Sequence, residues 1–354
     1  MSPLNINDFA MLTPMRYYNN EDASNQKRKD MVENKDGQFI ATCKKDGDWA
    51  MLIHYSKGNN LIRSRSISKV TGVYGDYTAK VPHIAEEMDS WPDNTVVLAE
   101  LCWDQDGTNA NTVGTILRCL PAKAVERQKE NKLKAVVFDI LMYASKDLTS
   151  VGYYERLTDW AFDFINSHDW NYIKLTEIIE DDFAAAADRI IANGGEGVVI
   201  QRKDYIYSPG SRTAWKTLKL KQQLPEMELK VVGTLKPNKY YEGDCPETWG
   251  YWYQDISYTD EDGVWHGPNS QMGNFPVTKP YFYGWKNGIT VELPDGTTTD
   301  VTSGLTDDDR AWLATKAAAQ MIKNNELYAV VKAMSFNDKG RLRHPSLVRL
   351  RNDL

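Results

Sequence analysis

The chain has 354 residues, a length typical of two domains, and its composition of 42% hydrophobic and 26% charged residues is ordinary for a globular protein with buried cores. No apolar run reaches the roughly 18 residues that a membrane-spanning helix needs. The first residues also lack a basic segment followed by an apolar stretch, so the sequence predicts neither a membrane anchor nor a secretory signal.

The cysteines and histidines exclude the common zinc and disulfide patterns. None of the cysteines forms a CxxC pair, and the five histidines do not form an HExxH motif. This argues against a zinc site, a zinc hydrolase and a disulfide scaffold, and it suits a reducing cytosol. The cysteines are Cys43, Cys102, Cys119 and Cys245.

Charge is distributed unevenly along the chain. The net charge of −7 disfavours a nucleic-acid partner when taken over the whole molecule. Residues 202–239 nevertheless hold nine Lys and Arg against three acids, and residues 339–351 hold five Lys and Arg and no acid. A local basic face on an acidic protein is compatible with a polyanion. Scattered surface charge would give the same counts, so this observation alone assigns no partner.

In the first part of the chain, strands and helices are expected in alternation. Residues 38–55 form two apolar runs around Lys44–Gly47 and predict a hairpin-like strand pair. Further strands are expected at 61–68, 96–101, 135–141 and 197–202, and helices at 81–91, 121–132, 153–168 and 182–193.

The character of the sequence changes near Met227. Short β-like runs separated by turn residues predict a small barrel or sandwich, with a domain boundary at 222–225. The runs lie at 228–235, 249–258, 288–294 and 328–336, and one helical segment is expected at 307–324.

The sharpest local signal for chemistry is the tetrapeptide Lys44-Lys45-Asp46-Gly47. A lysine attacks as a nucleophile only when its amine is neutral, which burial or neighbouring cations favour. A lysine at a strand end beside a tight turn could be held rigidly for this purpose. Taken alone, the tetrapeptide is better explained by a solvated hairpin turn.

A series of residues in apolar strands follows this motif in order. Glu100 and Glu196 are carboxylates in or beside apolar strands, where an unpaired charge is costly. Phe138-Asp139 lies in another apolar strand, and Lys219 and Lys221 alternate so that both face one side of an extended chain. Each residue taken separately has a simple structural explanation.

Taken together, the order Lys, Glu, Phe, Glu, Lys-x-Lys resembles the covalent nucleotidyltransferase superfamily, which includes ATP-dependent DNA ligases and RNA-capping enzymes. The resemblance implies that Lys44 is the nucleophile, within the motif completed by Asp46 and Gly47. It further implies that Phe138 stacks on the purine. The other roles it implies are nucleotide contacts by Thr42, Arg65, Glu100 (ribose), Lys219 and Lys221, metal contacts by Glu100 and Glu196, and further arginines at Arg118 and Arg156. Lys216 competes with its neighbours for one of the lysine roles.

The second half is similar to the oligonucleotide-binding (OB) barrel of DNA ligases. Its final motif contains Arg349, Arg351 and Asp353. The resemblance to minimal, bacteriophage-type ligases implies an α+β fold. In that fold an adenylation domain of antiparallel sheets with flanking helices (residues 1–223) precedes an OB-fold barrel (residues 224–354). A flexible joint near 222–225 would let the barrel move between nucleotide and duplex.

Three positions depart from the family pattern. Trp49 stands where the family has an arginine, and Thr42 stands where DNA ligases often carry the acid that reads the adenine amino group. The final motif commonly has a lysine after its Asp, where this chain has Leu354. These departures bear on which nucleotide the site accepts.

The resemblance implies an ATP-dependent DNA ligase that seals 5′-phosphate/3′-OH nicks through lysyl-AMP and an adenylated DNA end. ATP is the implied co-substrate, Mg²⁺ or Mn²⁺ the metal and nicked duplex DNA the partner. No membrane or zinc is expected, and the protein is expected to be a monomer in a bacterial or phage-infected cytoplasm. The alternative is an RNA ligase with the same chemistry, and a degenerate ligase that only binds duplexes is a third reading. The Trp-rich segment 238–283 predicts packed strands or a nucleic-acid contact.

Overall fold

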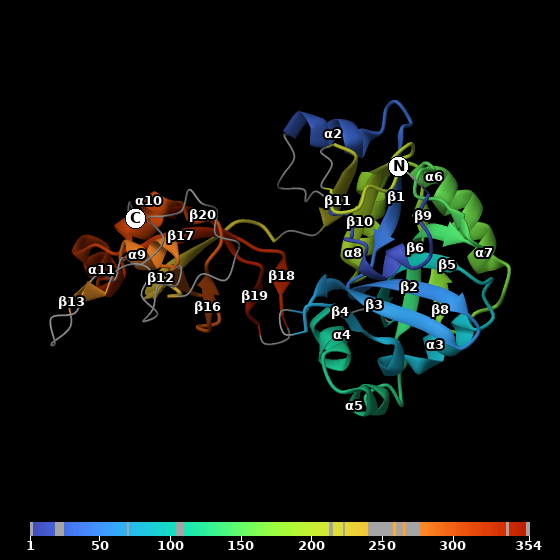
Figure 1. Ribbon diagram of the computed structural model, residues 1–354. Coiled ribbons are helices and arrows are strands. Elements are labelled where there is room, and N and C mark those ends of the chain that lie inside the picture. The colour runs from blue at the N-terminus through green and yellow to red at the C-terminus, as the bar shows by residue number, and fades with distance from the viewer. Residues whose placement is uncertain are drawn as a thin grey trace. The chain divides into compact units, whose positions relative to one another are not determined.

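The computed structural model describes residues 3–17, 25–68, 71–103, 110–211, 215–221, 224–239, 258–259, 265–266, 277–337 and 340–351. The chain divides into two compact units, Met1–Lys221 and Gln222–Leu354 (Figure 1). Within the described residues, no helix has the length and apolar character required to cross a bilayer.

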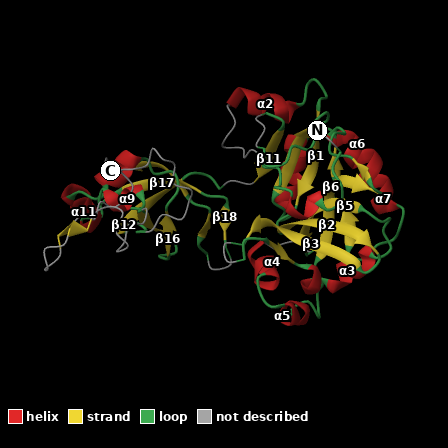
Figure 2. Cartoon of the chain, in the orientation of Figure 1, coloured by secondary structure: helices red, strands yellow, loops and turns green. Residues whose placement is uncertain are grey.

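The first unit is built on two antiparallel sheets, which Figure 2 shows in yellow with helices around them. The small sheet has the strand order β11-β10-β1-β9. These strands are β1 (Phe39–Lys44), β9 (Ile178–Ile179), β10 (Gly197–Arg202) and β11 (Thr217–Lys221).

The large sheet has the order β4-β3-β2-β5-β6-β7, and β8 pairs with β6 as the one parallel neighbour among the described strands. Its strands are β2 (Asp48–Ser56), β3 (Asn59–Ile67), β4 (Tyr74–Asp76), β5 (Thr95–Cys102), β6 (Lys134–Tyr143), β7 (Lys146–Asp147) and β8 (Ile173–Leu175).

Helices lie around the two sheets, some on their outer faces and some beside the core between them. They are α1 (Asp8–Met11), α2 (Asn25–Glu33), η2 (Thr78–Lys80), α3 (Pro82–Met88), α4 (Ala110–Leu117), α5 (Pro121–Glu126), α6 (Tyr153–Glu155), η3 (Arg156–Ala161), α7 (Phe162–Asn166) and α8 (Phe183–Ala192).

Each sheet has its own apolar core, and a third core lies between them. Ile84 of α3, Val113 of α4 and Phe164 of α7 pack on the outer face of the large sheet, and Phe183 of α8 packs on the outer face of the small sheet. Trp49, Met51 and Leu98 belong to the core between the sheets. Polar side chains on the two inner faces are therefore partly buried beside this core.

The predicted hairpin over residues 38–55 is wrong, because β1 and β2 belong to different sheets. β1 pairs with β10 and β9, whereas β2 pairs with β3 and β5. Both are interior strands that already have two hydrogen-bonded neighbours. The chain crosses between the sheets at Lys44–Gly47, and a Cβ on Gly47 would lie 2.2 Å from the backbone oxygen of Leu101. Only glycine fits this close approach.

Three predicted helices are shorter or divided. The helix expected at 121–132 is only α5, after which the side chain of Gln128 hydrogen-bonds with the backbone of Lys80, Ala124 and Leu133. The helix expected at 153–168 contains the π-helical turn η3, which begins at the buried Arg156. The helix expected at 307–324 is α10 (Asp307–Trp312) and α11 (Lys316–Lys323), because Thr315 caps a new helix start.

The second unit contains a five-stranded antiparallel sheet in the order β16-β15-β12-β17-β20. An isolated parallel bridge joins Ser303, just after β16, to Ser346 of β20 at the opposite edge. Gly304 permits this approach, since a Cβ there would lie 2.2 Å from the oxygen of Leu347. Leu229, Val291 and Val331 lie in the core of the unit.

The elements of this unit are β12 (Met227–Leu235), β13 (Tyr258–Thr259), β14 (Trp265–His266), α9 (Lys279–Phe282), β15 (Gly288–Glu292), β16 (Thr298–Val301), α10, α11, β17 (Tyr328–Lys332), β18 (Ser335–Phe336), β19 (Leu342–Arg343) and β20 (Ser346–Arg351). Most of the strand expected at 249–258, with Trp249 and Trp252, lies outside the described residues.

Candidate active site

A cavity of about 310 Å³ lies between the inner faces of the two sheets. Its lining includes charged, polar and apolar side chains from both sheets. They are Tyr17, Thr42, Cys43, Lys44, Lys45, Gly47, Asp48, Trp49, Arg65, Ser66, Glu100, Val136, Phe138, Thr176, Val199, Gln201 and Lys219.

The strand register of the small sheet determines which of its residues line the cavity. Lys44 is paired with Gly197, and Thr42 is paired with Val199, which in turn lies opposite Lys219. Because side chains alternate along a strand, these residues share the face that borders the cavity. Gln201 follows Val199 on that face and is the residue of the row farthest from Lys44.

Lys44 and Glu196 form an ion pair where the chain leaves the small sheet. The Lys44 ammonium donates a hydrogen bond to the Glu196 carboxylate, and the side chains are 18% and 9% exposed. Lys44 ends β1, and Glu196 directly precedes β10, so the antiparallel pairing of these strands brings the two side chains together. The amine is thereby held at the cavity wall.

Glu100 approaches the same site from the large sheet. It lies opposite Trp49 on β2 and Val136 on β6. Burial, which is the largest cause, raises the pKa of the Glu100 carboxyl. The Lys44 ammonium opposes the rise and the Glu196 carboxylate adds to it, and the resulting pKa is about 7. Two carboxylates therefore share one partly enclosed site with one amine.

Cations complete the polar end of the cavity. Burial, which is the largest cause, and the neighbouring charges of Lys44 and Arg65 together lower the pKa of Lys219 to about 8. An anion that enters the site stabilises the ammonium form of a lysine whose pKa has been lowered in this way. This end of the cavity is therefore suited to a phosphate.

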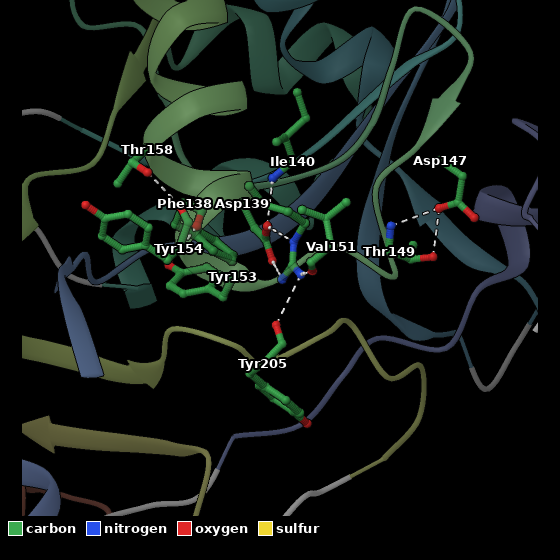
Figure 3. Close-up of polar contacts among 11 residues, drawn as sticks. Phe138, Asp139, Ile140, Asp147, Thr149, Val151, Tyr153, Tyr154, Thr158 and Tyr205 are labelled. Atoms are coloured by element: carbon green, nitrogen blue, oxygen red, sulfur yellow. Dashed lines mark hydrogen bonds and ion pairs between the residues drawn. The ribbon is translucent and has the colours of Figure 1, made fainter. Parts of the chain in front are cut away.

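A fully buried ion pair stands directly behind Phe138. Arg156 donates from Nε to Asp139 Oδ1 at 2.8 Å and from Nη2 to Asp139 Oδ2 at 2.9 Å (Figure 3). Although burial alone would lower it, the Asp139 carboxylate holds the pKa of Arg156 above its usual value. Since Asp139 and Phe138 are consecutive in β6, this pair fixes the strand that presents the Phe138 ring to the cavity.

Of the predicted residues, Thr42, Lys44, Gly47, Arg65, Glu100, Phe138 and Lys219 line the cavity, and Glu196 contacts Lys44. Lys221 lies opposite Gly197 on β11 and adds to the positive charge around Lys219. Lys216 instead lies with its amine 5.1 Å from the centre of the Tyr205 ring. Asp46 belongs to the segment that crosses between the sheets, and Arg118 follows α4 and lies in the electrostatic field of Asp48.

The predicted arginines near the end of the chain belong to the second unit. Arg349 and Arg351 are in β20, and Arg351 forms an ion pair with Glu228 at 2.5 Å. Asp353 lies outside the described residues.

The sequence model of the family described as "ATP dependent DNA ligase domain" matches residues 22–221 of this chain. The chain belongs to this family. The match covers the two sheets and the lining of the cavity except Tyr17, so the ligase domain lies within the first unit.

Two curated relatives support this membership. A DNA ligase of Methanococcus aeolicus is 30% identical over 142 residues, which are 39% of this chain and 25% of the relative. A DNA ligase of Thermococcus fumicolans is 26% identical over 213 residues, which are 58% of this chain and 36% of the relative. The matched part thus spans between a quarter and somewhat over a third of these relatives.

A solved structure of similar size shares the fold. The structure described as "DNA binding with a minimal scaffold: Structure-function analysis of Lig E DNA ligases" has a TM-score of 0.57 and 15% identity. The similarity covers 89% of this chain and 93% of that one. The mixed α+β architecture with antiparallel sheets is therefore the ligase nucleotidyltransferase fold.

Several residues of this ligase-domain cavity were not singled out from the sequence. Gln201 is the most informative, since it is buried and lines the cavity. Period-two alternation from Glu196 could have indicated that residues 197, 199 and 201 share a face, but not that this face borders a cavity. Tyr17 and Asp48 lie in segments whose sequence carries no comparable signal.

The oxygen donors at the polar end fit a magnesium ion better than a transition metal. Among the described residues, no group of three or more His, Cys, Asp and Glu could hold a metal by protein ligands alone. Mg²⁺ commonly takes one or two carboxylates and completes its shell with water and substrate phosphates. Glu196 and Glu100 meet that requirement.

Proposed function

We propose that this protein seals 5′-phosphate/3′-OH nicks in duplex DNA at the expense of ATP, with Lys44 as the nucleophile. The observation that carries the proposal is the Lys44–Glu196 contact at the polar end of a cavity that also presents Lys219 and the Phe138 ring. Membership of the ATP-dependent DNA ligase family supports the choice of nucleotide and of reaction.

In the first step the neutral amine of Lys44 attacks the α-phosphorus of ATP. A P–N bond forms, the α–β phosphoanhydride breaks, pyrophosphate leaves with the bonding electron pair, and the attacking nitrogen loses one proton to solvent and keeps the other. Lys219 and Arg65 stand at the cavity wall where negative charge develops. Such preorganised cations supply most of the catalysis in phosphoryl-type transfers.

Two further transfers complete the reaction. An oxygen of the 5′-phosphate at the nick attacks the phosphorus of lysyl-AMP, the P–N bond breaks, and the Lys44 nitrogen takes up a proton from solvent and leaves as the amine. The adjacent 3′-OH then attacks the 5′-phosphorus and expels AMP, with loss of its proton. Positioning by the cavity walls does most of the work, because side chains other than Lys44 form no covalent bond.

A magnesium ion would be held by Glu196 and Glu100. When bound, it would neutralise phosphate charge and orient the triphosphate. Glu196 would hold the metal through the carboxylate that contacts the Lys44 amine in this structure.

We further propose that the second unit is an OB-fold domain, residues 224–354, that contacts the DNA backbone. Support comes from its five-stranded antiparallel sheet, whose edge segments meet at the Ser303–Ser346 bridge. In this proposal Arg349 and Arg351 bind phosphates, and recognition is largely independent of base sequence.

The central test is covalent labelling with α-³²P-ATP. The wild-type protein should become labelled, and Lys44→Ala should abolish the label. Lys219→Ala is the matched control, because it removes another lysine of the same cavity. It should slow labelling and leave the adduct on Lys44 when the modified peptide is mapped by mass spectrometry. A label that survives Lys44→Ala would remove Lys44 from the nucleophile role.

A nicked substrate then tests the acceptor. Sealing of a nicked DNA duplex with a 5′-phosphate should be faster than sealing of the same nick in an RNA duplex. The opposite preference would assign the RNA ligase alternative, and labelling without sealing of either would contradict the proposed overall reaction.

A further inference from the structure

Gln201 carries a buried acceptor that the protein itself does not use. The side chain is 1% exposed, and its Oε1 oxygen is buried without a hydrogen-bond partner in the described part of the chain. Gln201 also lines the cavity between the two sheets. A buried carbonyl oxygen without a donor is costly, so its retention in a binding cavity indicates a ligand that supplies the donor.

The neighbouring hydroxyl determines which way the Gln201 amide faces. The Tyr153 hydroxyl donates its only proton to the backbone oxygen of Phe138 at 3.0 Å. Its oxygen is then left to accept. Burial raises the pKa of Tyr153, and the side chains of Thr42 and Gln201 oppose this rise, as donors directed at the Tyr153 oxygen do. The Gln201 group that faces Tyr153 is therefore the amide NH₂, and Oε1 faces away from it. Figure 3 shows Tyr153 beside Phe138.

The position of Gln201 along β10 places it at the end of the cavity that would hold a base. Gly197 lies opposite Lys44, and Gln201 is four residues farther along the strand, a distance of about 13 Å at roughly 3.3 Å per residue. This is the scale of a nucleoside monophosphate. Val199 lies between them on the same face, and Phe138 lines the cavity from the large sheet.

We propose that Gln201 Oε1 accepts a hydrogen bond from the exocyclic amino group of adenine and thereby selects ATP. This inference rests on the proposed function, since it assigns the base end of the same nucleotide site. Gln201 is thus a specificity-determining residue, and Tyr153 is a positioning residue that holds its amide.

The same geometry disfavours GTP. Guanine carries a carbonyl oxygen where adenine carries the amino group, so two acceptors would face each other. Turning the amide to present NH₂ would bring Oε1 to the Tyr153 oxygen, whose proton is already donated to Phe138. The discrimination therefore comes from a fixed amide orientation, and a site built in this way rejects an analogue that leaves its polar groups unpaired.

The test compares ATP with purine riboside triphosphate, which lacks only the amino group. Dissociation constants are measured by calorimetry in the Lys44→Ala background, where no transfer can occur. We expect ATP to bind roughly ten- to a hundredfold more tightly than the analogue, as for loss of one hydrogen bond to a buried acceptor. Gln201→Leu should weaken ATP binding and leave binding of the analogue nearly unchanged, so that the ratio approaches one.

Two further variants keep the test decisive. Gln128→Leu makes the same substitution at a buried glutamine whose amide is fully engaged away from the cavity. It should lower thermal stability and keep the ATP-to-analogue ratio. Tyr153→Phe should free the Gln201 amide to turn and should raise GTP binding relative to ATP.

An equal loss of both nucleotides in Gln201→Leu, or a wild-type-like ratio, would overturn the proposal. Because the experiment measures nucleotide binding, its result does not depend on whether Lys44 reacts with ATP. A wild-type protein that shows the predicted binding ratio without covalent labelling would contradict the nucleophile role of Lys44 and support Gln201.

Discussion

Two ion pairs in the first unit occupy very different surroundings. Asp139 and Arg156 are both 0% exposed, and Arg156 also donates to the backbone oxygens of Val151 and Tyr205 (Figure 3). Lys44 and Glu196 retain some contact with solvent and line or adjoin a cavity that also contains Glu100 and Lys219.

The difference shows how one fold separates stability from chemistry. The Asp139–Arg156 pair is enclosed and engaged on both oxygens, so it holds β6 and the following π-helical turn in place. The Lys44–Glu196 pair shares its site with a second carboxylate and a second lysine, so its partners can be exchanged when a nucleotide enters. Breaking the Asp139–Arg156 pair should therefore mainly lower the free energy of unfolding. Breaking the Lys44–Glu196 pair should mainly lower the rate of catalysis.

The largest effect on stability is expected from Asp139→Ala. This change leaves the Arg156 charge buried without a carboxylate, and breaking such a pair typically costs about 3–5 kcal/mol of unfolding free energy. Urea denaturation followed by tryptophan fluorescence measures the loss. Lys44→Ala serves as the control and should change stability by less than about 1 kcal/mol. Similar losses in the two variants would erase the distinction between the pairs.

Glu196→Gln should have the converse outcome. Its amide keeps the shape of the side chain but cannot compensate a metal charge or pair with the Lys44 ammonium. The rate of lysyl-nucleotide formation should fall roughly 100- to 1,000-fold, as for loss of one preorganised electrostatic contact. Rapid-quench labelling measures the rate, and thermal denaturation should show a nearly unchanged midpoint. Unfolding instead of slow labelling would make the cavity pair a structural one.

Glu100, which lines the cavity, should make the free energy of unfolding depend on pH. Its folded pKa of about 7 is above the ordinary 4.5, so between these values the folded protein binds a proton that the unfolded chain has released. Stability contributed by this group is present at low pH and is lost as pH rises towards 7. The effect is of the order of 1–2 kcal/mol, because the side chain keeps partial contact with solvent.

The variant Glu100→Gln isolates this contribution. It should be no more stable than the wild type near pH 4.5 and more stable at pH 8, as measured by urea denaturation across that range. A stability difference that does not change with pH would mean that Glu100 is ionised in the folded protein throughout this range. It would weaken the comparison between the Asp139–Arg156 pair and the cavity site, where burial disfavours a charge on Glu100.

The sequence by itself determined much of the secondary structure. The apolar runs at 96–101, 135–141 and 197–202 are strands β5, β6 and β10 because continuous apolar segments of this length become buried strands. The order of Lys44, Glu100, Phe138 and Lys219 also indicated one site, and the structure brings these side chains to one cavity. Their chemical roles stay predictions that the labelling and binding experiments test.

Tertiary structure alone decided how the strands are assigned to sheets and which side chains face each other. Residues 38–55 read locally as a hairpin, yet β1 and β2 find their hydrogen-bond partners in distant segments. The pairing of Asp139 with Arg156 and the orphaned oxygen of Gln201 depend on that packing as well. Local patterns encode which face of a strand is buried, but only the complete fold determines what lies opposite.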